Sequence, residues 1–373
     1  MIWNWKQNNW PQFTYDKEKL LNYENQFLEQ AGVLYGSMKH IDDQDKDILK
    51  VDLISNEAFK TSEIEGEILN RDSLQSSIRK HFGLKTDNRR VPPAEHGIAE
   101  MMIDLYATYQ SEMNHESLFS WHRMLTNGRR DLIDIGNYRT HEDPMQVVSG
   151  ALHNPTVHFE APPSIIVKKE MQQFIKWFNE TGQEGELKLP ALFRSGIAHI
   201  YFESIHPFED GNGRIGRAIS EKALSQNLGR PTLIAISHTI ESKKKEYYDA
   251  LHNGSKDLEI TGWLTYFCEM VLQAQSYTQS MIDFLIEKSK FYHRFAKKLN
   301  PRQVKAVKRI FQEGIDGFKG GLSAENYIKI TGTTRATTTR DLQNLVEQGA
   351  LFKTGELKST RYFLNIDGKR VMQ

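Results

Sequence analysis

The chain has a single cysteine, Cys268, so it cannot form an internal disulfide bond. This cysteine follows Phe267 in an apolar, helix-like stretch, where we expect a small core residue in a reducing compartment. The sequence also lacks a run of about eighteen uncharged apolar residues, and its start lacks the basic-then-apolar order of a secretion signal. We therefore expect a soluble cytoplasmic protein with no membrane partner.

An excess of charge of either sign is missing as well. Lys and Arg together number 48, and so do Asp and Glu. Charged residues make up 26% of the chain and hydrophobic residues 39%, which is typical of a folded protein and gives no sign of a polyanionic partner. Any nucleic-acid surface must therefore be local. A chain of 373 residues is long enough for two or three domains.

Apolar residues recur at three- and four-residue steps along most of the chain, which predicts a mainly α fold. Changes in the pattern suggest three domains: a helical N-terminal domain at residues 1–110, a helical core at 111–280, and a connector helix with a further domain at 281–373. One stretch, MQVVSGALHNPTVHFEAPP, alternates short β-branched runs with turn residues. It predicts a short β-hairpin that could serve as a flap in the otherwise helical core.

The segment after Asn300 and Pro301 has a pattern of its own. The order helix, helix, turn, helix and two short strands predicts a winged helix-turn-helix. Lys353, Lys358 and Arg361 lie around the predicted wing, where they could meet the phosphates of DNA. The module is only mildly basic, and winged helices also bind proteins or form dimers, so DNA binding, protein binding and a homodimer all stay open.

The densest group of polar residues is HPFEDGNGRIGR, which runs from His206 to Arg217. A helical stretch precedes it and Pro207 discourages another turn, so His206 should lie at the end of a helix. The glycines that follow permit a turn whose backbone N–H groups form a concave anion site, strengthened by the next helix. Arg214 and Arg217 can each donate paired hydrogen bonds to phosphate, and Asn212 can donate one more.

An acidic residue in the same turn needs a different explanation. Asp210 would repel phosphate unless it holds a Mg²⁺ that bridges to the phosphate oxygens. An imidazole titrates near neutral pH, so His206 can take a proton from a hydroxyl group as that group attacks phosphorus. The motif therefore indicates nucleotidyl or phosphoryl transfer.

These residues match the pattern His-x-Phe-x-Asp/Glu-Gly-Asn-Gly-Arg-x-x-Arg, and the chain resembles the Fic family, named after filamentation induced by cyclic AMP. GNYRT at residues 136–140 is a second, weaker match, and the likeness covers roughly residues 50 to 275. The resemblance implies an all-helical enzyme that uses ATP and Mg²⁺ to transfer AMP to a Ser, Thr or Tyr hydroxyl of a target protein, releasing pyrophosphate. It implies that His206 is the general base, that Asp210 holds Mg²⁺, and that the phosphates meet Gly211, Asn212, Gly213, Arg214, Gly216 and Arg217.

The resemblance implies two further contacts with the nucleotide. The flap would align the target segment by backbone pairing, and its residues nearest to the nucleotide would be Val148, Ser149, Gly150 and Ala151. In the segment EYYDAL, Tyr247 and Tyr248 would border the adenine. Two alternatives stay open: the hairpin could have only a structural role, and the two tyrosines could only pack their helix against its neighbours.

Upstream, KTSEIEGEIL contains Thr61, Glu65 and Gly66 in an order that resembles the inhibitory-helix motif of Fic proteins, Ser/Thr-x-x-x-Glu-Gly/Asn. Thr61 and Glu65, four residues apart, would share one helix face. The resemblance implies that Glu65 forms a salt bridge with Arg217 and occupies the arginine that should hold the terminal phosphate. The chain would then belong to the N-terminally inhibited subclass. A solvated helical face is the alternative.

Other functions stay open beside AMP transfer. Fic relatives also transfer other phosphate-containing groups, and some remove AMP from a modified target, in which case Glu65 would position a water molecule. The target protein could be the chain itself. A different class of function is a DNA-binding regulator that uses the C-terminal module, with the Fic core as a sensor or dormant.

Overall fold

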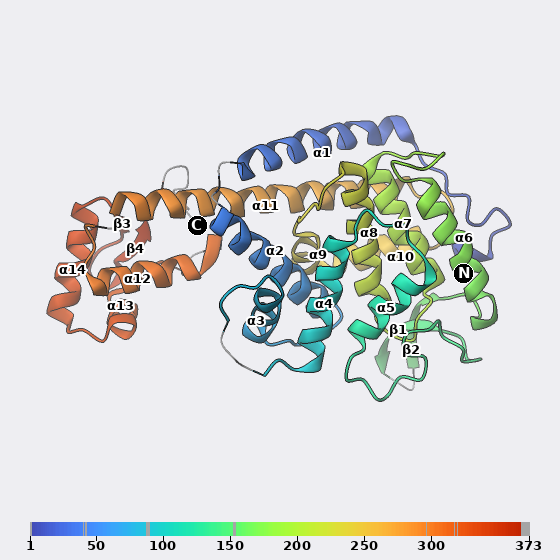
Figure 1. Cartoon of the computed structure of the whole chain (residues 1–373), viewed down its shortest axis with the longest axis horizontal. Helices are drawn as coiled ribbons and strands as arrows, with labels where there is room; N and C mark the ends of the chain where they lie inside the picture. Colours follow the sequence, from blue (N-terminus) through green and yellow to red (C-terminus); the bar gives the residue numbers. More distant parts are fainter. Residues whose placement is uncertain are drawn as a thin grey trace. The chain divides into compact units, whose positions relative to one another are not determined.

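The structure is a computed structural model that describes residues 2–39, 41, 43–86, 90–151, 154–295, 297–316, 318 and 320–366. It is mainly helical, which confirms the predicted fold class (Figure 1). In the described ranges, no helix combines the length and the apolar character needed to cross a bilayer. The chain divides into two compact units, one of Met1–Gly36 and Lys46–Thr278 and the other of Ser37–Asp45 and Gln279–Gln373. Residues 46–110, which the sequence assigns to the N-terminal domain, thus lie in the same compact unit as most of the predicted core.

The first unit begins with a short 3₁₀ helix, η1 (Asn4–Lys6), and continues with α1 (Lys17–Met38), α2 (Asp43–Ile64), α3 (Arg71–His81) and α4 (Pro93–Ala107). Local sequence explains several of these boundaries. The side chain of Asn70 accepts a hydrogen bond from the backbone N–H of Ser73 and so caps α3. After α2, Gly66 adopts a φ of 81°, which glycine tolerates and which reverses the direction of the chain.

The centre of the first unit is built from α5 (His115–Leu125), α6 (Ser164–Glu180), α7 (Ala191–Ile205), α8 (Asn212–Leu228), α9 (Ile236–Ser242), α10 (Lys244–Gly254) and the start of α11 (Thr261–Phe295). Every residue of α7 is buried, because this helix is surrounded by others on all sides. Helix α8 packs along it, and together the two helices frame the loop between Ile205 and Asn212. The loop carrying the histidine motif is therefore fixed at both ends by buried helices.

The predicted hairpin is present. Strand β1 (Gln146–Ala151) pairs antiparallel with β2 (Asn154–Glu160), with a register shift between Val147 and Val148. Its base is anchored by the N-terminal segment, because the buried Trp3 packs edge-on against Phe159 with ring centroids 5.2 Å apart. The hairpin belongs to the same compact unit as the motif loop.

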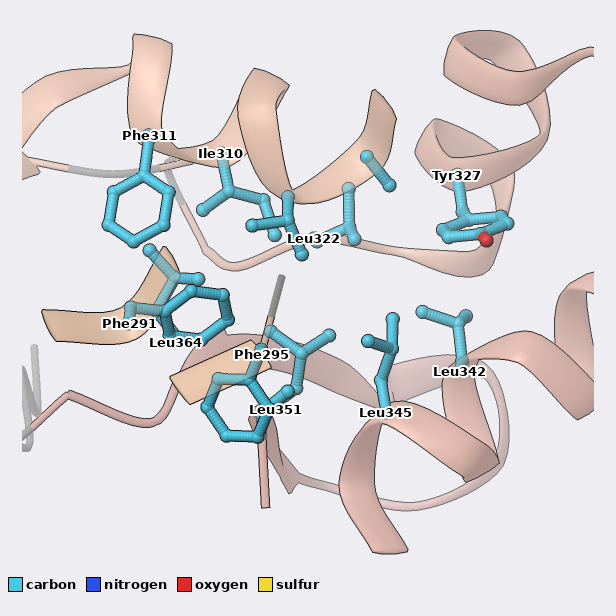
Figure 2. Packing of buried hydrophobic residues seen from close by; sticks show 13 residues of the cluster. Phe291, Phe295, Ile310, Phe311, Leu322, Tyr327, Leu342, Leu345, Leu351 and Leu364 are labelled. Carbon is cyan, nitrogen blue, oxygen red and sulfur yellow. The ribbon is translucent and has the colours of Figure 1, made fainter. Parts of the chain in front are cut away.

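The second unit contains the end of α11 followed by α12 (Pro301–Gln312), η2 (Gly314–Asp316), α13 (Ala324–Thr331), α14 (Arg335–Glu347), β3 (Leu351–Thr354), η3 (Leu357–Ser359) and β4 (Arg361–Leu364). Strands β3 and β4 pair antiparallel. Figure 2 shows its core, in which Phe291 and Phe311 lie near Leu351 and Leu364. The order of elements is the predicted one, while a winged helix-turn-helix and DNA binding stay predictions. The boundary expected at residue 280 falls within α11.

Candidate active site

A cavity of about 660 Å³ lies in the first unit, between the hairpin, the motif loop, α10 and the end of α2. Among the residues predicted for the site, the lining includes Glu65, Gly66, Val148, His206, Asp210, Gly211, Asn212, Gly213, Arg217, Tyr247 and Tyr248. Of the described residues, Thr61, Arg214 and Gly216 lie outside this lining. Ser149, Gly150 and Ala151 belong to β1 and pair with Thr156, Pro155 and Asn154; their side chains fall outside the described part.

His206 forms the C-cap of α7, as the Pro207 that follows it predicts. It has a φ of 50°, a left-handed conformation that a residue with a side chain adopts only when its surroundings hold it. Arg139, from the GNYRT segment, stabilises this conformation. Its Nε donates a hydrogen bond to the carbonyl oxygen of His206 at 2.9 Å, and its backbone N–H donates one to the carbonyl oxygen of Pro207 at 3.0 Å. The second, weaker sequence match therefore supports the backbone of the first.

The turn after Phe208 is closed by Asn212. The Asn212 side chain accepts a hydrogen bond from the Phe208 N–H at 2.9 Å and donates one to the Phe208 carbonyl at 2.8 Å. Its side-chain amide is thus engaged within the loop, although the sequence suggested a phosphate contact. Gly211 has a φ of 85° and precedes the first turn of α8, whose N–H groups face an anion favourably.

His122 supports the same turn from α5. Its Nδ1 accepts a hydrogen bond from the Gly136 N–H at 2.9 Å, so the ring proton lies on Nε2, which donates to the Asp210 carbonyl at 3.1 Å. Burial lowers the pKa of His122 to about 4, so the ring is neutral at physiological pH. Its ring stacks on Phe208 at 4.3 Å. His122 is therefore a structural residue that supports the motif turn.

The Asp210 carboxylate is held by two arginines. Arg129, from the loop after α5, donates to Oδ2 at 2.5 Å, and Arg214 lies 3.3 Å from Oδ1. Burial favours the neutral acid, but Arg214 and Arg129 together hold the pKa of Asp210 below its usual range. Asp210 is therefore anionic. Sequence reasoning missed Arg129, which is 81 residues away in the chain and carries no motif of its own.

The end of α2 reaches the second arginine of the motif. Arg217, 3% exposed, donates from Nη2 to Glu65 Oε1 at 2.6 Å and from Nε to the Thr61 hydroxyl at 2.7 Å. Gly213 makes this approach possible, because a Cβ at that position would lie 2.2 Å from Glu65 Oε1. The three residues of the predicted contact thus meet at the edge of the cavity.

A second acidic residue of the same turn contacts the other arginine. Arg214 Nη1 donates to Glu67 Oε2 at 2.6 Å, and the Arg214 side chain is 4% exposed. Sequence reasoning did not identify Glu67. The sequence feature that could have indicated it is its position two residues after Glu65, directly after Gly66. Both motif arginines are therefore paired with carboxylates from one turn.

The two tyrosines of α10 differ in their surroundings. Tyr247 is buried, and its hydroxyl lies 2.7 Å from His199 Nε2. Tyr248 is 38% exposed, and its hydroxyl lies 3.5 Å from the Ile64 carbonyl. Tyr247 is thus fixed by α7, while Tyr248 presents more of its ring to the cavity and to solvent.

Residues 112–224 match the family described as Fic/DOC, and residues 3–84 match a domain of unknown function, DUF4172. The protein adenylyltransferase fic-1 of Caenorhabditis elegans is 25% identical over 205 residues, which are 52% of this chain and 35% of the worm protein. A probable protein adenylyltransferase of Aquifex aeolicus is 35% identical over 69 residues, 18% of this chain and 20% of that protein. The aligned part thus spans well under half of these relatives.

Solved structures share the fold. A Fic family protein from Desulfovibrio desulfuricans G20 superposes with a TM-score of 0.52 at 19% identity, over 93% of this chain and 97% of that one. Residues 134–508 of C. elegans Fic-1 superpose with a TM-score of 0.50 at 19% identity, over 70% of this chain and 74% of that one. Residues 112–224, which carry the motif loop and match the Fic/DOC family, are therefore a Fic domain, and the chain shares its fold with a solved Fic family protein.

Proposed function

We propose that the protein is an adenylyltransferase that moves AMP from ATP to a Ser, Thr or Tyr hydroxyl of a target protein. The observation that carries this proposal is the meeting of His206, Asp210 and Arg217 at one cavity of about 660 Å³. The names of the curated relatives, protein adenylyltransferases, support the same reaction at the level of the family.

The reaction assigns a task to each group around the cavity. The hydroxyl oxygen attacks the α-phosphorus, and its proton passes to the imidazole of His206. The bond from that phosphorus to the bridging oxygen breaks, and its electron pair leaves with pyrophosphate. The N–H groups at the start of α8 and the guanidinium of Arg217 would bind the negative phosphate oxygens.

The residues present suit a Mg²⁺ ion that arrives with the nucleotide. Asp210 supplies an ionised carboxylate at the cavity. In the part of the chain that the structure describes, no group of three or more His, Cys, Asp or Glu side chains could hold a metal by itself. This agrees with the way Mg²⁺ is usually bound, through one or two carboxylates and the phosphates of the substrate. When bound, Mg²⁺ neutralises charge on the phosphate oxygens.

We also infer that Glu65 restrains the enzyme. Its carboxylate forms an ion pair with the Arg217 guanidinium at 2.6 Å. While this ion pair persists, the guanidinium cannot bind the terminal phosphate of ATP. A displaced triphosphate would place its α-phosphorus away from the attack line, and a displacement of about 1 Å can cost on the order of a hundredfold in rate. Glu65 thus lowers the rate without closing the cavity.

Labelling with ATP radioactive at the α-phosphate tests both roles. We expect weak incorporation into protein by the wild type, about tenfold or more incorporation by Glu65→Gly, and none by His206→Ala. Glu63→Gly is the matched control, because Glu63 lies in the last turn of α2, two residues before Glu65, but pairs with Lys60 at 2.7 Å; it should label like the wild type. Equal labelling by all four proteins would contradict the proposal, and mass spectrometry of the labelled protein would locate the AMP.

A further inference from the structure

A buried carboxylate lies beside the catalytic imidazole. Glu203 is on the last turn of α7, three residues before His206, and its side chain is 9% exposed. Its Oε2 lies 3.5 Å from Nδ1 of His206, and both residues line the cavity. The carboxylate therefore faces the ring nitrogen that is nearer to the backbone.

The surroundings of Glu203 preserve this arrangement. Its Oε1 is buried and has no hydrogen-bond partner in the described part of the structure. A Cβ on Gly216 would lie 2.5 Å from that oxygen, so the glycine of α8 leaves the space that the carboxylate fills. Because an isolated buried charge is costly, this carboxylate depends on the polar groups beside it.

The carboxylate is ionised. Burial alone would favour the neutral acid, but the His206 imidazole 3.5 Å away, with further contributions from His199 and Arg217, holds the pKa of Glu203 below its usual range. An ionised carboxylate can only accept a hydrogen bond, so in a hydrogen bond between these two groups Nδ1–H of His206 is the donor.

We propose that Glu203 is a positioning residue whose carboxylate accepts the Nδ1–H of His206 and so leaves Nε2 free to take the proton of the target hydroxyl. This rests on the proposed function. As the O–H bond of the hydroxyl breaks and the Nε2–H bond forms, the imidazole becomes positively charged, and the nearby carboxylate stabilises that charge. Arg139 fixes the backbone of His206, while Glu203 sets the tautomer and the orientation of its ring.

The tautomer can be measured without any turnover. In the full chain with ¹⁵N-labelled histidine, two-dimensional NMR reports which ring nitrogen carries the proton, and His206→Ala identifies the signals of His206. We expect the Nδ1–H form in the wild type and in Glu203→Gln, whose side-chain oxygen still accepts. We expect a shift toward the Nε2–H form in Glu203→Leu, which has no acceptor. An Nε2–H form in the wild type, or an unchanged tautomer in Glu203→Leu, would overturn the proposal.

Kinetics of AMP transfer in a Glu65→Gly background supply the second test. We expect kcat to fall about tenfold in Glu203→Gln, which loses the charge, and about a hundredfold in Glu203→Leu, with the KM for ATP unchanged. Glu170→Gln is the matched control, because Glu170 is also buried but bonds Trp10 at 2.7 Å, and it should keep the parent kcat.

The outcomes separate the two proposals. If Glu203→Leu does not fold, the near-isosteric Glu203→Gln tests the positioning role by itself. An unchanged kcat in Glu203→Gln overturns that role. If no variant transfers AMP, the proposed function fails, and the NMR measurement still tells whether Glu203 sets the tautomer of His206.

Discussion

Arg214 and Arg217 are paired with two carboxylates of one short turn: Arg214 with Glu67 and Arg217 with Glu65, each at 2.6 Å. The left-handed Gly66 between the two glutamates lets both side chains point at α8. The two arginines are three residues apart on that helix and so lie on one face. A single turn therefore occupies both arginines that the family resemblance assigns to the phosphates.

Glu67→Gln should raise the affinity for ATP. The substitution frees the Arg214 guanidinium, and a charge-assisted hydrogen bond corresponds to a change of about tenfold in binding. Isothermal titration calorimetry with Mg-ATP on His206→Ala, which avoids turnover, would measure it. The control is Glu63→Gln, which alters a carboxylate paired with Lys60. Equal affinity in Glu67→Gln and the control would show that the ion pair does not compete with the nucleotide.

Arg129→Ala should strengthen binding of the divalent ion. Arg129 donates to Asp210 Oδ2 at 2.5 Å, so its positive guanidinium competes with a cation for this carboxylate. Electron paramagnetic resonance with Mn²⁺ and a non-hydrolysable ATP analogue would report about tenfold tighter binding. Arg130→Ala removes the same charge from the exposed neighbouring position and should leave the affinity unchanged. Weaker Mn²⁺ binding in Arg129→Ala would instead make Arg129 part of the nucleotide site.

Glu57 should make stability depend on pH. Both of its carboxylate oxygens accept the Ser237 N–H, and burial raises its pKa from 4.5 to about 7. The folded protein therefore holds a proton that the unfolded chain releases, and the stability from this group is present below pH 4.5 and lost as pH rises through about 7.

Urea unfolding across that window would measure the effect. The free energy of unfolding should decrease as pH rises from about 4.5 to about 7, and Glu57→Gln should flatten the curve. The buried Glu221 contributes in the same direction, since burial and the charge of Glu57 also raise its pKa. An identical slope in the wild type and in Glu57→Gln would assign the dependence to other groups.

Asn212→Ala should lower both stability and activity. The variant loses the two hydrogen bonds that close the turn on Phe208, and buried hydrogen bonds of this kind contribute about 1 kcal/mol each. Chemical denaturation should show a loss of about 2 kcal/mol. Asn8→Ala, at an exposed position, is the control. A fully stable Asn212→Ala that binds ATP weakly would favour the phosphate contact expected from the sequence.

Local patterns of the sequence predicted the helical fold, the hairpin and the place of His206 at a helix end. These features depend on neighbouring residues: Pro207 stops α7, and β-branched runs flank the turn of the hairpin. Arg129 and Glu67 could not be predicted in the same way. Their partners lie 81 and 147 residues away, so only the packed structure shows that these side chains meet the motif. Glu203, one helical turn before His206, was within reach of the sequence.

The engagement of Asn212 shows a second limit. An amide next to a glycine-rich turn can donate to a ligand or to its own loop, and the sequence alone does not distinguish the two. The same holds for Tyr247, which could border a base but bonds His199 at 2.7 Å. Such choices depend on which acceptor the fold brings within about 3 Å.

Glu65 and Arg217 belong to one compact unit of one chain. Their association is therefore intramolecular, and its equilibrium does not change when the protein is diluted or concentrated. Under the proposed restraint by Glu65, release would follow from a ligand that outcompetes the carboxylate already in place, or from an event that moves the turn after α2 away from α8. The first would make activity depend on nucleotide concentration, with a lowered apparent affinity, whereas the second would give the cell a control independent of its ATP supply.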